Sequence, residues 1–416
     1  MSKYIIEGGR PLFGAVEVQG AKNAVLPIFA ACVLTEKEVV VKNVPDLADV
    51  VSMENILINL GVSVRREGST RILCAKELRS DNIPNELAKE LRSSVFLLGS
   101  VIGRMKSARV AYPGGCDIGL RPIDIHIKGL SDLGVKIDER AGYLICDGSE
   151  LCGGEVVLDY PSVGATENVM LAAVLAGGDT VIRNAAREPE IVDLQNFLCL
   201  LGAKVKGAGT SEIRIRGVRS LGGAEYAVMP DRICLGTWIL ATATCGGEVA
   251  LIGGRRTEIH SLLCKLDKSS CHIREDSGIM YIKATGETVL SERVTTRPYP
   301  GFPTDLQAQY CAYACAARGT CVVTENIFEN RFRHVPELIK MGADITVRDR
   351  VAVIKGTPHL IGAEVMARDL RGGAALVIAG LAAHGKTIVG DVRHIDRGYQ
   401  AMEKTLSNIG AKIVRI

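Results

Sequence analysis

One structural unit recurs six times along the 416 residues of this chain, roughly every 70 residues. Each copy opens on a polar or basic residue, continues into an apolar segment of about four helical turns, and passes through a glycine turn into a β-branched strand. The six openings are Lys22, Arg92, Ala165, Arg232, Asp305 and Arg371. This periodicity predicts a set of similar α/β units that stack in space.

The strands that follow the six apolar helices share their β-branched composition. They are predicted at 39–43, 108–112, 180–184, 249–252, 322–326 and 387–391. Between successive units, a Leu-Gly, Met-Gly or Ile-Gly pair predicts a second helix that ends at the glycine and leads into a strand. These glycines are Gly61, Gly134, Gly202, Gly342 and Gly410.

The length of the chain predicts two domains, because 416 residues exceed what one ordinary hydrophobic core supports. Six units divide naturally into two groups of three, with the break near Pro230. The region between the two groups is the predicted site. Helices that open on Lys22 or Arg371 could direct their anion-binding amino termini toward it.

The composition excludes several classes of protein. Hydrophobic residues make up 47% and charged residues 23% of the chain, as expected of a compact enzyme. Thirteen cysteines without a Cys-x-x-Cys pair, and histidines without ligand spacing, predict a reduced cytoplasmic protein with no metal site. A net charge of +3 without a basic block disfavours general nucleic-acid binding, and no apolar run is long enough for a signal peptide or membrane span.

The segment from Pro113 to Pro122 carries one cysteine, Cys116, among glycines and five residues before Arg121. Glycine allows unusual backbone angles, and a nearby guanidinium favours the thiolate, so the segment predicts a reactive cysteine on a loop. Other cysteines lie in apolar surroundings that predict packing in the core. Examples are Cys32, Cys199, Cys311 and Cys315.

The residues from Gly380 to Thr387 match the spacing of a phosphate-binding P-loop. A P-loop runs from a strand into a helix, whereas here glycines close an apolar helix and Thr387 begins a strand. The match therefore predicts a turn between a helix and a strand, without ATPase activity.

Several polar residues stand at helix openings or strand ends. Asp305 is either an N-cap or a general base. Arg331, Arg371 and Arg397 are either surface charges or binders of a small polyanion. Pro27 predicts the first turn of its helix, which would leave Lys22 and Asn23 on the preceding loop.

Ordered motifs along the whole chain resemble the UDP-N-acetylglucosamine 1-carboxyvinyltransferase family of enolpyruvyl transferases. The matching segments are 20–23 (Gly-Ala-Lys-Asn), 91–94, 113–126, 162–166, 301–309, 328–332, 369–371 and 396–398. The resemblance implies a two-domain inside-out α/β barrel with three βαβαββ-like units per domain. It places residues 22–229 in one domain and residues 1–21 plus 230–416 in the other, with hinges near residues 21 and 230.

The resemblance also implies the reaction, in which the enolpyruvyl group of phosphoenolpyruvate passes to the 3-hydroxyl of UDP-N-acetylglucosamine without a cofactor. Cys116 is then the proton donor, the site of a covalent pyruvate-type adduct and the target of fosfomycin, and Asp305 is the base. Phosphoenolpyruvate is expected to contact Lys22, Asn23, Arg121 and Arg397 through its phosphate, and Arg331 and Arg371 through its carboxylate. The nucleotide sugar is expected to contact Arg92, Arg121, Pro122, Ile123, Asp124, Ile125, Pro161, Ser162, Val163, Gly164, Asp305 and Ile327.

Two other functions stay open on the same repeats. An enzyme acting on shikimate 3-phosphate typically carries Gly-Ser-Lys-Ser where this chain has Gly-Ala-Lys-Asn, and it lacks the Cys116 loop. The other alternative is a non-catalytic or RNA-end-processing protein.

The chain departs from the resemblance at Tyr160, where relatives often carry a charge, and at Gly372 and Gly373, which could loosen the helix that carries Arg371. No feature demands a partner chain, so a monomer is expected.

Overall fold

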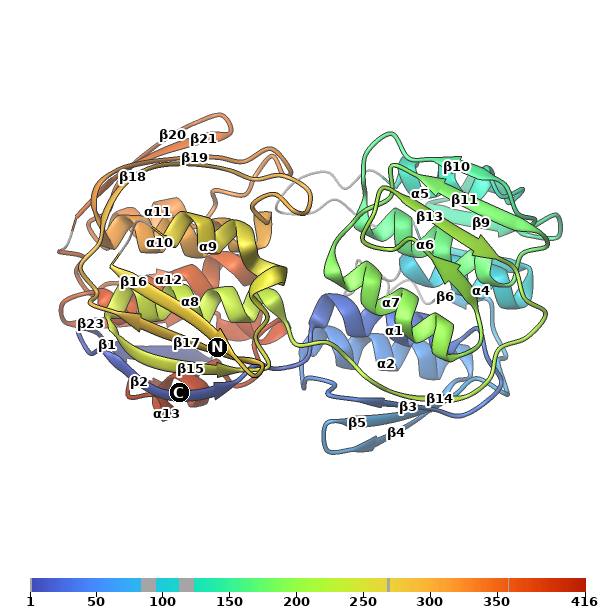
Figure 1. The fold of residues 1–416 in the computed structure, drawn as a ribbon, viewed down its shortest axis with the longest axis horizontal. Helices are drawn as coiled ribbons and strands as arrows, with labels where there is room; N and C mark the ends of the chain where they lie inside the picture. Colours follow the sequence, from blue (N-terminus) through green and yellow to red (C-terminus); the bar gives the residue numbers. More distant parts are fainter. Residues whose placement is uncertain (1, 84–94, 112–122, 268–269, 358) are drawn as a thin grey trace. The chain divides into compact units, whose positions relative to one another are not determined.

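The computed structural model describes residues 2–83, 95–111, 123–267, 270–357 and 359–416. These residues form two compact units. Unit 1 contains the described residues of ranges 1–19 and 230–416, and unit 2 contains those of range 20–229. Figure 1 shows that both ends of the chain belong to unit 1.

Each unit contains three four-stranded sheets among the described residues, and all six sheets share one topology. The first strand is parallel to the second, and the second, third and fourth strands are successively antiparallel. In chain order this is a βαβαββ unit, as β18, α10, β19, α11, β20 and β21 show. The structure thus confirms the predicted repeat, including all six β-branched strands.

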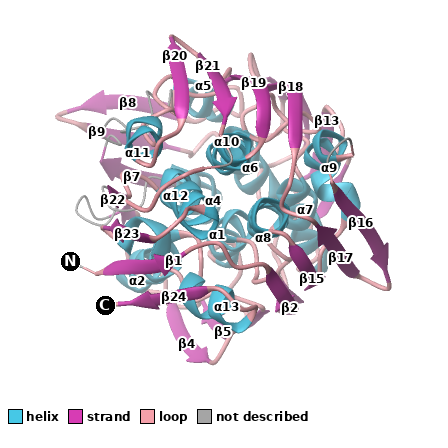
Figure 2. Cartoon of the chain, turned by 90° about the vertical axis from the view of Figure 1, so that its left-hand side faces the viewer, coloured by secondary structure: helices cyan, strands magenta, loops and turns pink. Residues whose placement is uncertain are grey.

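Figure 2 shows the sheets of unit 1 around the apolar helices of that unit. Their strands, in spatial order, are β2 (Leu12–Glu17), β15 (Gly247–Ile252), β17 (Ile279–Ala284) and β16 (Cys271–Asp276); β18 (Val289–Thr295), β19 (Arg318–Thr324), β21 (Val351–Gly356) and β20 (Asp344–Arg348); and β22 (Glu364–Met366), β23 (Lys386–Gly390), β1 (Lys3–Glu7) and β24 (Lys412–Arg415).

The sheets of unit 2 repeat this arrangement. Their strands are β14 (Ala224–Ala227), β3 (Val39–Lys42), β5 (Thr70–Cys74) and β4 (Ser63–Glu67); β6 (Asn82–Ile83), β7 (Ser107–Ala111), β9 (Tyr143–Asp147) and β8 (Lys136–Arg140); and β10 (Glu155–Val157), β11 (Asp179–Arg183), β13 (Glu212–Arg216) and β12 (Lys204–Lys206).

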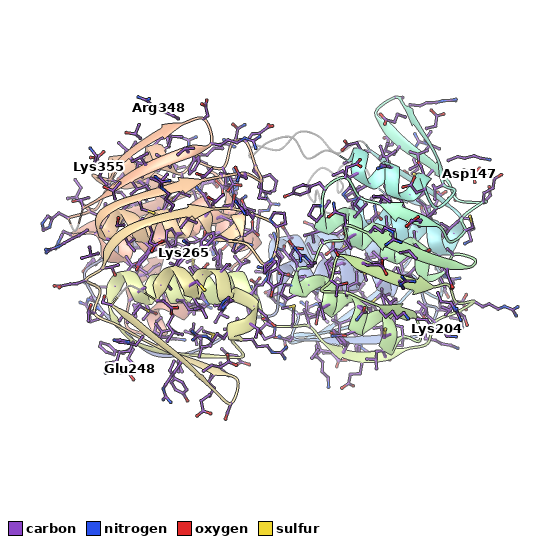
Figure 3. All side chains as sticks on the ribbon, turned by 45° about the horizontal axis from the view of Figure 1, so that its top comes forward. Asp147, Lys204, Glu248, Lys265, Arg348 and Lys355 are labelled. Atoms are coloured by element: carbon purple, nitrogen blue, oxygen red, sulfur yellow. The ribbon has the colours of Figure 1, made fainter. Side chains whose placement is uncertain are left out.

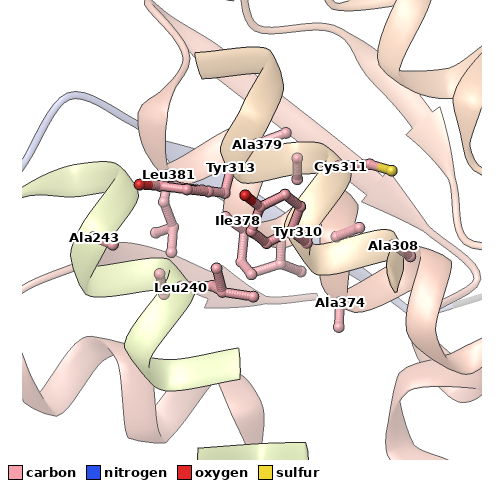
Figure 4. Close-up of a cluster of buried hydrophobic side chains, with 14 of the residues drawn as sticks. Leu240, Ala243, Ala308, Tyr310, Cys311, Tyr313, Ala374, Ile378, Ala379 and Leu381 are labelled. Atoms are coloured by element: carbon pink, nitrogen blue, oxygen red, sulfur yellow. The ribbon is translucent and has the colours of Figure 1, made fainter. Parts of the chain in front are cut away.

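The apolar helix of each repeat lies inside its unit. These helices are α1 (Lys22–Cys32), α4 (Leu97–Met105) and α6 (Val163–Val174) in unit 2, and α8 (Arg232–Cys245), α10 (Gln307–Ala316) and α12 (Leu370–Ala382) in unit 1. They are buried on nearly all sides, which explains why their sequences are apolar around the whole helix. Figure 4 shows part of the core of unit 1, where Leu240, Tyr310 and Ile378 come from the three central helices.

The second helix of each repeat is amphipathic and lies closer to the surface. These helices are α2 (Ala48–Leu60), α5 (Asp124–Ser131), α7 (Pro189–Leu200), α9 (His260–Leu266), α11 (Val335–Lys340) and α13 (Met402–Asn408). Short 3-10 helices precede three of the unit 1 helices, at η2 (Arg256–Ile259), η3 (Thr304–Leu306) and η4 (Val392–Arg397). After α2, Gly61 adopts the left-handed φ of 103°, a value that only glycine reaches without strain.

Two strands explain how one continuous chain builds two units. The repeat that begins at α1 takes its first strand from β14, which precedes the return of the chain to unit 1. The repeat that begins at α8 takes its first strand from β2, which precedes the departure of the chain to unit 2. The chain passes from one unit to the other between residues 19 and 20 and between residues 229 and 230. Next to these points, the backbone N–H of Ala21 donates to the carbonyl of Met229 within unit 2, and that of Asp231 donates to the carbonyl of Gln19 within unit 1.

Figure 3 labels Lys204, Glu248 and Lys355, which are charged side chains at exposed strand positions. Among the described segments, every helix falls short of the length and hydrophobicity that a membrane-spanning helix requires.

Gly385 follows α12 and precedes β23, which confirms that the apparent P-loop is a turn from helix to strand.

Two local predictions were wrong. Helix α1 begins at Lys22, so Lys22 and Asn23 belong to its first turn and Pro27 lies inside the helix. Pro27 lacks an N–H, but the tertiary packing of this fully buried segment maintains the helix through it. Cys199 is exposed, because the buried face of α7 passes through Phe197 and Leu198 and leaves the next residue outside.

Candidate active site

Asp305 and two of the predicted site arginines, Arg331 and Arg371, meet in unit 1. Arg331 Nη2 donates to Asp305 Oδ1 at 2.6 Å, and Arg371 Nη2 donates to Oδ2 at 2.8 Å. The two arginine side chains are 4% and 3% exposed, whereas the Asp305 carboxylate keeps 27% of its surface exposed. One carboxylate therefore joins two buried guanidinium groups and is the part of the cluster that solvent reaches.

The three side chains come from three different places in two successive repeats. Asp305 lies in η3 directly before α10, Arg331 lies in the turns between β19 and α11, and Arg371 lies in the first turn of α12. The carboxylate of Asp369 fixes the start of α12, because its Oδ1 accepts from the N–H groups of Arg371 and Gly372 at 3.0 and 2.9 Å. The helix thus begins with a complete cap in spite of its two glycines.

Asp305 does not serve as the cap of η3 or of α10. The residue before η3 is Pro303, and the residue before α10 is Leu306. The carboxylate of Asp305 instead accepts hydrogen bonds from the two arginines. The two arginines, rather than a helix terminus, therefore hold the Asp305 carboxylate in position.

Arg371 is held at both ends of its guanidinium group. Its Nη1 donates to the phenol oxygen of Tyr399 at 3.4 Å, and its carbon lies 5.7 Å from the centre of the Tyr399 ring. Burial is the largest single influence and would lower the pKa of Arg371, but the charge of Asp305, together with smaller contributions from Tyr399, Asp231 and Cys234, raises the pKa well above its usual value. The group is a permanent cation in the interior of unit 1.

The loop that carries Ile327 is organised by Glu325, a buried acid at the end of β19. Its Oε1 accepts from the N–H groups of Ile327 and Phe328 at 2.7 and 3.1 Å, and from the hydroxyl of Thr296 at 2.9 Å. Its Oε2 accepts from the hydroxyl of Thr304 at 2.9 Å. One buried carboxylate thus connects the Ile327 loop to the residue directly before Asp305.

Arg397 is the last residue of η4, and its side chain is half-buried. The next residue, Gly398, accepts a hydrogen bond from Gln19 Nε2 at 3.2 Å and from the Cys234 thiol at 3.4 Å. These contacts attach the Arg397 segment to α8 and to the amino-terminal part of unit 1.

In unit 2, Lys22 opens α1 and forms an ion pair. Its Nζ lies 3.1 Å from Asp49 Oδ2 on α2, and the two side chains are 14% and 7% exposed. Asn23 is the next residue of the same helical turn and is half-buried. The first turn of a helix is a favourable place for a phosphate, because its N–H groups are not used within the helix.

Two helix starts in unit 2 carry the expected nucleotide-sugar contacts. Ser162 caps α6 through its hydroxyl, which accepts from the N–H of Ala165 at 3.3 Å, and Pro161 precedes it while Val163 and Gly164 form the first turn. Ile123 precedes α5, whose first residues are Asp124 and Ile125.

Close packing brings these two helix starts together. A Cβ atom at Gly164 would lie 2.7 Å from the Phe96 ring and 3.1 Å from the His126 ring, so only glycine fits. His126 Nδ1 lies 3.1 Å from Asn168 Nδ2, and burial lowers the pKa of His126 to about 4. His126 is therefore a neutral packing residue between α5 and α6.

Four predicted site residues lie outside the described residues: Cys116, Arg92, Arg121 and Pro122. Within the described residues, no group of three or more His, Cys, Asp or Glu side chains is placed to hold a metal ion.

Three partners of the site residues were missed by the sequence reasoning: Tyr399, Glu325 and Asp49. Only their positions in the sequence could have indicated that they lie near the site. Tyr399 follows Arg397 by two residues, Glu325 follows a buried strand, and Asp49 opens a second helix. No residue pattern indicated which of them would contact a site arginine or lysine.

Comparisons with known proteins show which family the chain resembles. The family model described as EPSP synthase (3-phosphoshikimate 1-carboxyvinyltransferase) matches residues 6–406. The UDP-N-acetylglucosamine 1-carboxyvinyltransferase 2 of Caldanaerobacter subterraneus subsp. tengcongensis is 50% identical over the full length of both chains. The corresponding enzyme of Nitratidesulfovibrio vulgaris strain Hildenborough is 47% identical over 100% of this chain and 99% of its own.

Solved structures show the same fold at lower identity. The enolpyruvyl transferase NikO from Streptomyces tendae has a TM-score of 0.89 at 24% identity and covers 100% of this chain and 98% of its own. EPSP synthase from Acinetobacter baumannii has a TM-score of 0.75 at 19% identity and covers both chains fully. With this fold, and with relatives that are about half identical from end to end, the chain belongs to the UDP-N-acetylglucosamine 1-carboxyvinyltransferases of the enolpyruvyl transferase family.

Proposed function

We propose that this protein transfers the enolpyruvyl group of phosphoenolpyruvate to the 3-hydroxyl of UDP-N-acetylglucosamine and releases phosphate. This reaction is the first committed step of peptidoglycan precursor synthesis, and the protein carries it out in the cytoplasm as a monomer. The observation that carries the proposal is the 50% identity to an enzyme of that name over the full length of both chains.

The reaction proceeds by addition and elimination. Cys116 donates a proton to the methylene carbon of phosphoenolpyruvate, and its central carbon becomes electrophilic. Asp305 accepts the proton of the sugar hydroxyl, whose oxygen forms the new bond to that carbon. The Cys116 thiolate then takes a proton back from the methyl group of the tetrahedral ketal, and the ketal expels phosphate, which restores the double bond. The Cys116 sulfur can also add to the central carbon and form a phospholactoyl thioether.

The Asp305 cluster fits the role of a base. Two guanidinium groups at 2.6 and 2.8 Å keep the carboxylate ionised, because each favours its charged form. The carboxylate is also the exposed member of the cluster, so a substrate hydroxyl can approach it. Arg331 and Arg371 then hold the carboxylate of phosphoenolpyruvate, and Lys22, Asn23, Arg121 and Arg397 hold its phosphate.

The nucleotide sugar is held in this proposal by the starts of α5 and α6, by Asp305 and Ile327, and by three residues that lie outside the described ones. Its contacts are Arg92, Arg121, Pro122, Ile123, Asp124, Ile125, Pro161, Ser162, Val163, Gly164, Asp305 and Ile327. The contacts proposed for phosphoenolpyruvate include residues of both units, and hinges are proposed near residues 21 and 230.

Shikimate 3-phosphate is the alternative acceptor, since the matching family model carries the name of the enzyme that uses it. Phosphate release measured with each acceptor separates the two. We expect turnover with UDP-N-acetylglucosamine and none with shikimate 3-phosphate. The reverse result would assign the shikimate enzyme, and salt-sensitive RNA binding with neither turnover would assign a nucleic-acid role.

Fosfomycin tests the assignment of Cys116. We expect irreversible loss of activity and a mass increase on the peptide that contains Cys116, because the epoxide is opened by a reactive thiolate. The exposed cysteines Cys152, Cys199 and Cys264 serve as internal controls that stay unmodified. A Cys116→Asp variant should resist the drug. Full activity after long exposure, with an unmodified Cys116 peptide, would contradict the assignment.

A further inference from the structure

We propose that Tyr399 is the positioning residue of this site: its phenol holds the Arg371 guanidinium in contact with Asp305. The proposal rests on the proposed function, which assigns Arg371 to the carboxylate of phosphoenolpyruvate and Asp305 to the sugar hydroxyl. Tyr399 touches neither substrate in this scheme and acts through Arg371.

The contacts of Arg371 divide between its two terminal nitrogens. Nη2 donates to Asp305 Oδ2 at 2.8 Å, and Nη1 donates to the Tyr399 oxygen at 3.4 Å. The guanidinium carbon also lies 5.7 Å from the centre of the Tyr399 ring, within the range of a cation–π interaction. The tyrosine thus contacts Arg371 on the side away from the carboxylate.

The hydrogen bonds of Tyr399 have only one consistent set of directions. The hydroxyl of Thr237 donates to the carbonyl of Ile233 at 2.8 Å, so it accepts from the Tyr399 hydroxyl at 2.9 Å. Gln309 Nε2 and Arg371 Nη1 both donate to the Tyr399 oxygen, at 3.0 and 3.4 Å. The phenol gives one hydrogen bond and accepts two, which uses its full capacity.

This network connects all three central helices of unit 1, because Thr237 lies on α8, Gln309 on α10 and Arg371 on α12. Tyr399 is 1% exposed, and the ring of Trp238 packs against its ring at a centroid distance of 6.1 Å. Burial raises the pKa of Tyr399 to about 12, so the phenol stays protonated at physiological pH.

Tyr399 also follows Arg397 by two residues, and its N–H donates to the carbonyl of Ile395 at 3.0 Å within η4. A single buried side chain therefore links the arginine assigned to the carboxylate of phosphoenolpyruvate with the segment that carries the arginine assigned to its phosphate. Displacing the phenol should disturb phosphoenolpyruvate more than the nucleotide sugar.

The variant Tyr399→Phe removes one oxygen and keeps the ring. Arg371 then loses the hydrogen bond at Nη1, while Ile233 keeps its bond from Thr237. We expect kcat/KM for phosphoenolpyruvate to fall about tenfold or more, since a loss of one hydrogen bond to a charged group corresponds to that range. We expect the Kd of UDP-N-acetylglucosamine to change less than twofold.

The matched control is Tyr310→Phe. Tyr310 is fully buried on α10 in the same core, and its hydroxyl has no hydrogen-bond partner among the described residues (Figure 4). The control removes the same atom from the same unit without touching Arg371. We expect its kinetic constants for both substrates to equal those of the parent protein.

The experiment measures phosphate release by the parent, Tyr399→Phe and Tyr310→Phe proteins, together with crystal structures of the parent and of Tyr399→Phe. A Tyr399→Phe protein with the kinetics of Tyr310→Phe, or with the Arg371 to Asp305 contact retained, would overturn the proposal. A parent protein that releases no phosphate would overturn the proposed function. The two structures would still decide the role of Tyr399 by whether Arg371 leaves Asp305.

Discussion

Two buried arginines share the two oxygens of Asp305, and this arrangement determines what the carboxylate can do. Removing Asp305 would leave two guanidinium groups buried without their common counter-charge, which is costly in a protein interior. A variant of equal shape is therefore needed to separate the chemical role of the carboxylate from its structural role.

For Asp305→Asn we expect turnover to fall by about 10² to 10⁴, the range that a general base contributes. The amide still accepts one hydrogen bond, so the affinity for the nucleotide sugar should change far less. Initial rates, calorimetric titration and urea unfolding measure the three effects, and Glu329→Gln provides a control at an exposed acid two residues from Arg331. Equal losses of turnover and affinity would indicate that Asp305 only binds.

Glu167 on α6 provides a test of pH dependence. Both of its carboxyl oxygens are buried and find no hydrogen-bond partner among the described residues, and burial, followed by the charges of Glu190 and Glu188, raises its pKa well above 4.5. The folded protein therefore keeps this proton to a higher pH than the unfolded chain. Its contribution to stability falls as pH rises above the unfolded pKa.

Replacing Glu167 with glutamine removes this penalty. The variant should gain stability over the parent by at least about 1 kcal/mol between pH 5 and pH 8, because one pKa unit corresponds to about 1.4 kcal/mol. Urea unfolding at both pH values measures the difference. Glu212→Gln is the control, since the hydrogen bond from Arg214 lowers the pKa of that half-buried carboxylate. A constant difference between Glu167→Gln and the parent would contradict the prediction.

Helix caps decide where the central helices begin, and they differ in strength. Asp231 caps α8 through Oδ1, which accepts from the N–H groups of Ile233 and Cys234 at 2.8 and 2.9 Å, and it is 4% exposed. Ser162 caps α6 with one bond at 3.3 Å. The aspartate therefore satisfies more of the unpaired N–H groups at its helix start.

We expect Asp231→Ala to lower the free energy of unfolding by about 1–2 kcal/mol and Ser162→Ala by less. Asp231→Asn should restore most of the loss, because the amide oxygen accepts the same bonds. Urea unfolding followed by circular dichroism measures all three variants. An Asp231→Ala loss no greater than that of Ser162→Ala would show that the cap does not set the stability of α8.

The glycine turns and the apolar helices followed directly from local sequence, whereas the start of α1 did not. A proline predicts a first turn because its ring opposes the interior of a helix. In α1 the residues from Ala24 to Cys32 are all buried, so packing on every side outweighs the loss of one hydrogen bond at Pro27. Local propensity was overruled where the burial was greatest.

At the level of the protein as a whole, unit 1 depends on the amino terminus. Strand β1 lies between β23 and β24 and completes a sheet whose other strands come from the last 60 or so residues. Ile6 of β1 is fully buried, while Ile5 points to the opposite face and is half-buried. A substitution at Ile6 should therefore destabilise the strands that the last residues of the chain contribute to this sheet.

We expect Ile6→Ala to destabilise unit 1 by about 2–5 kcal/mol and Ile5→Ala by clearly less. Hydrogen exchange followed by mass spectrometry should show faster exchange in β23 and β24 of the Ile6→Ala protein and unchanged exchange in β3 and β5 of unit 2. Equal acceleration in both units would mean that they unfold together.

The repeat pattern alone determined the six α/β units, their order, the central strands and the helix-to-strand turns, because these depend on periodicity and on glycine at fixed places. It also indicated Asp305, Arg331 and Arg371 as polar residues at element ends. Their meeting on one carboxylate was decided by tertiary structure, since Arg331 and Arg371 stand 40 residues apart and contact the same group only after two repeats pack together. The buried partners Tyr399, Glu325 and Asp49 could not be predicted for the same reason, because burial and hydrogen-bond direction depend on neighbours that are distant in the chain.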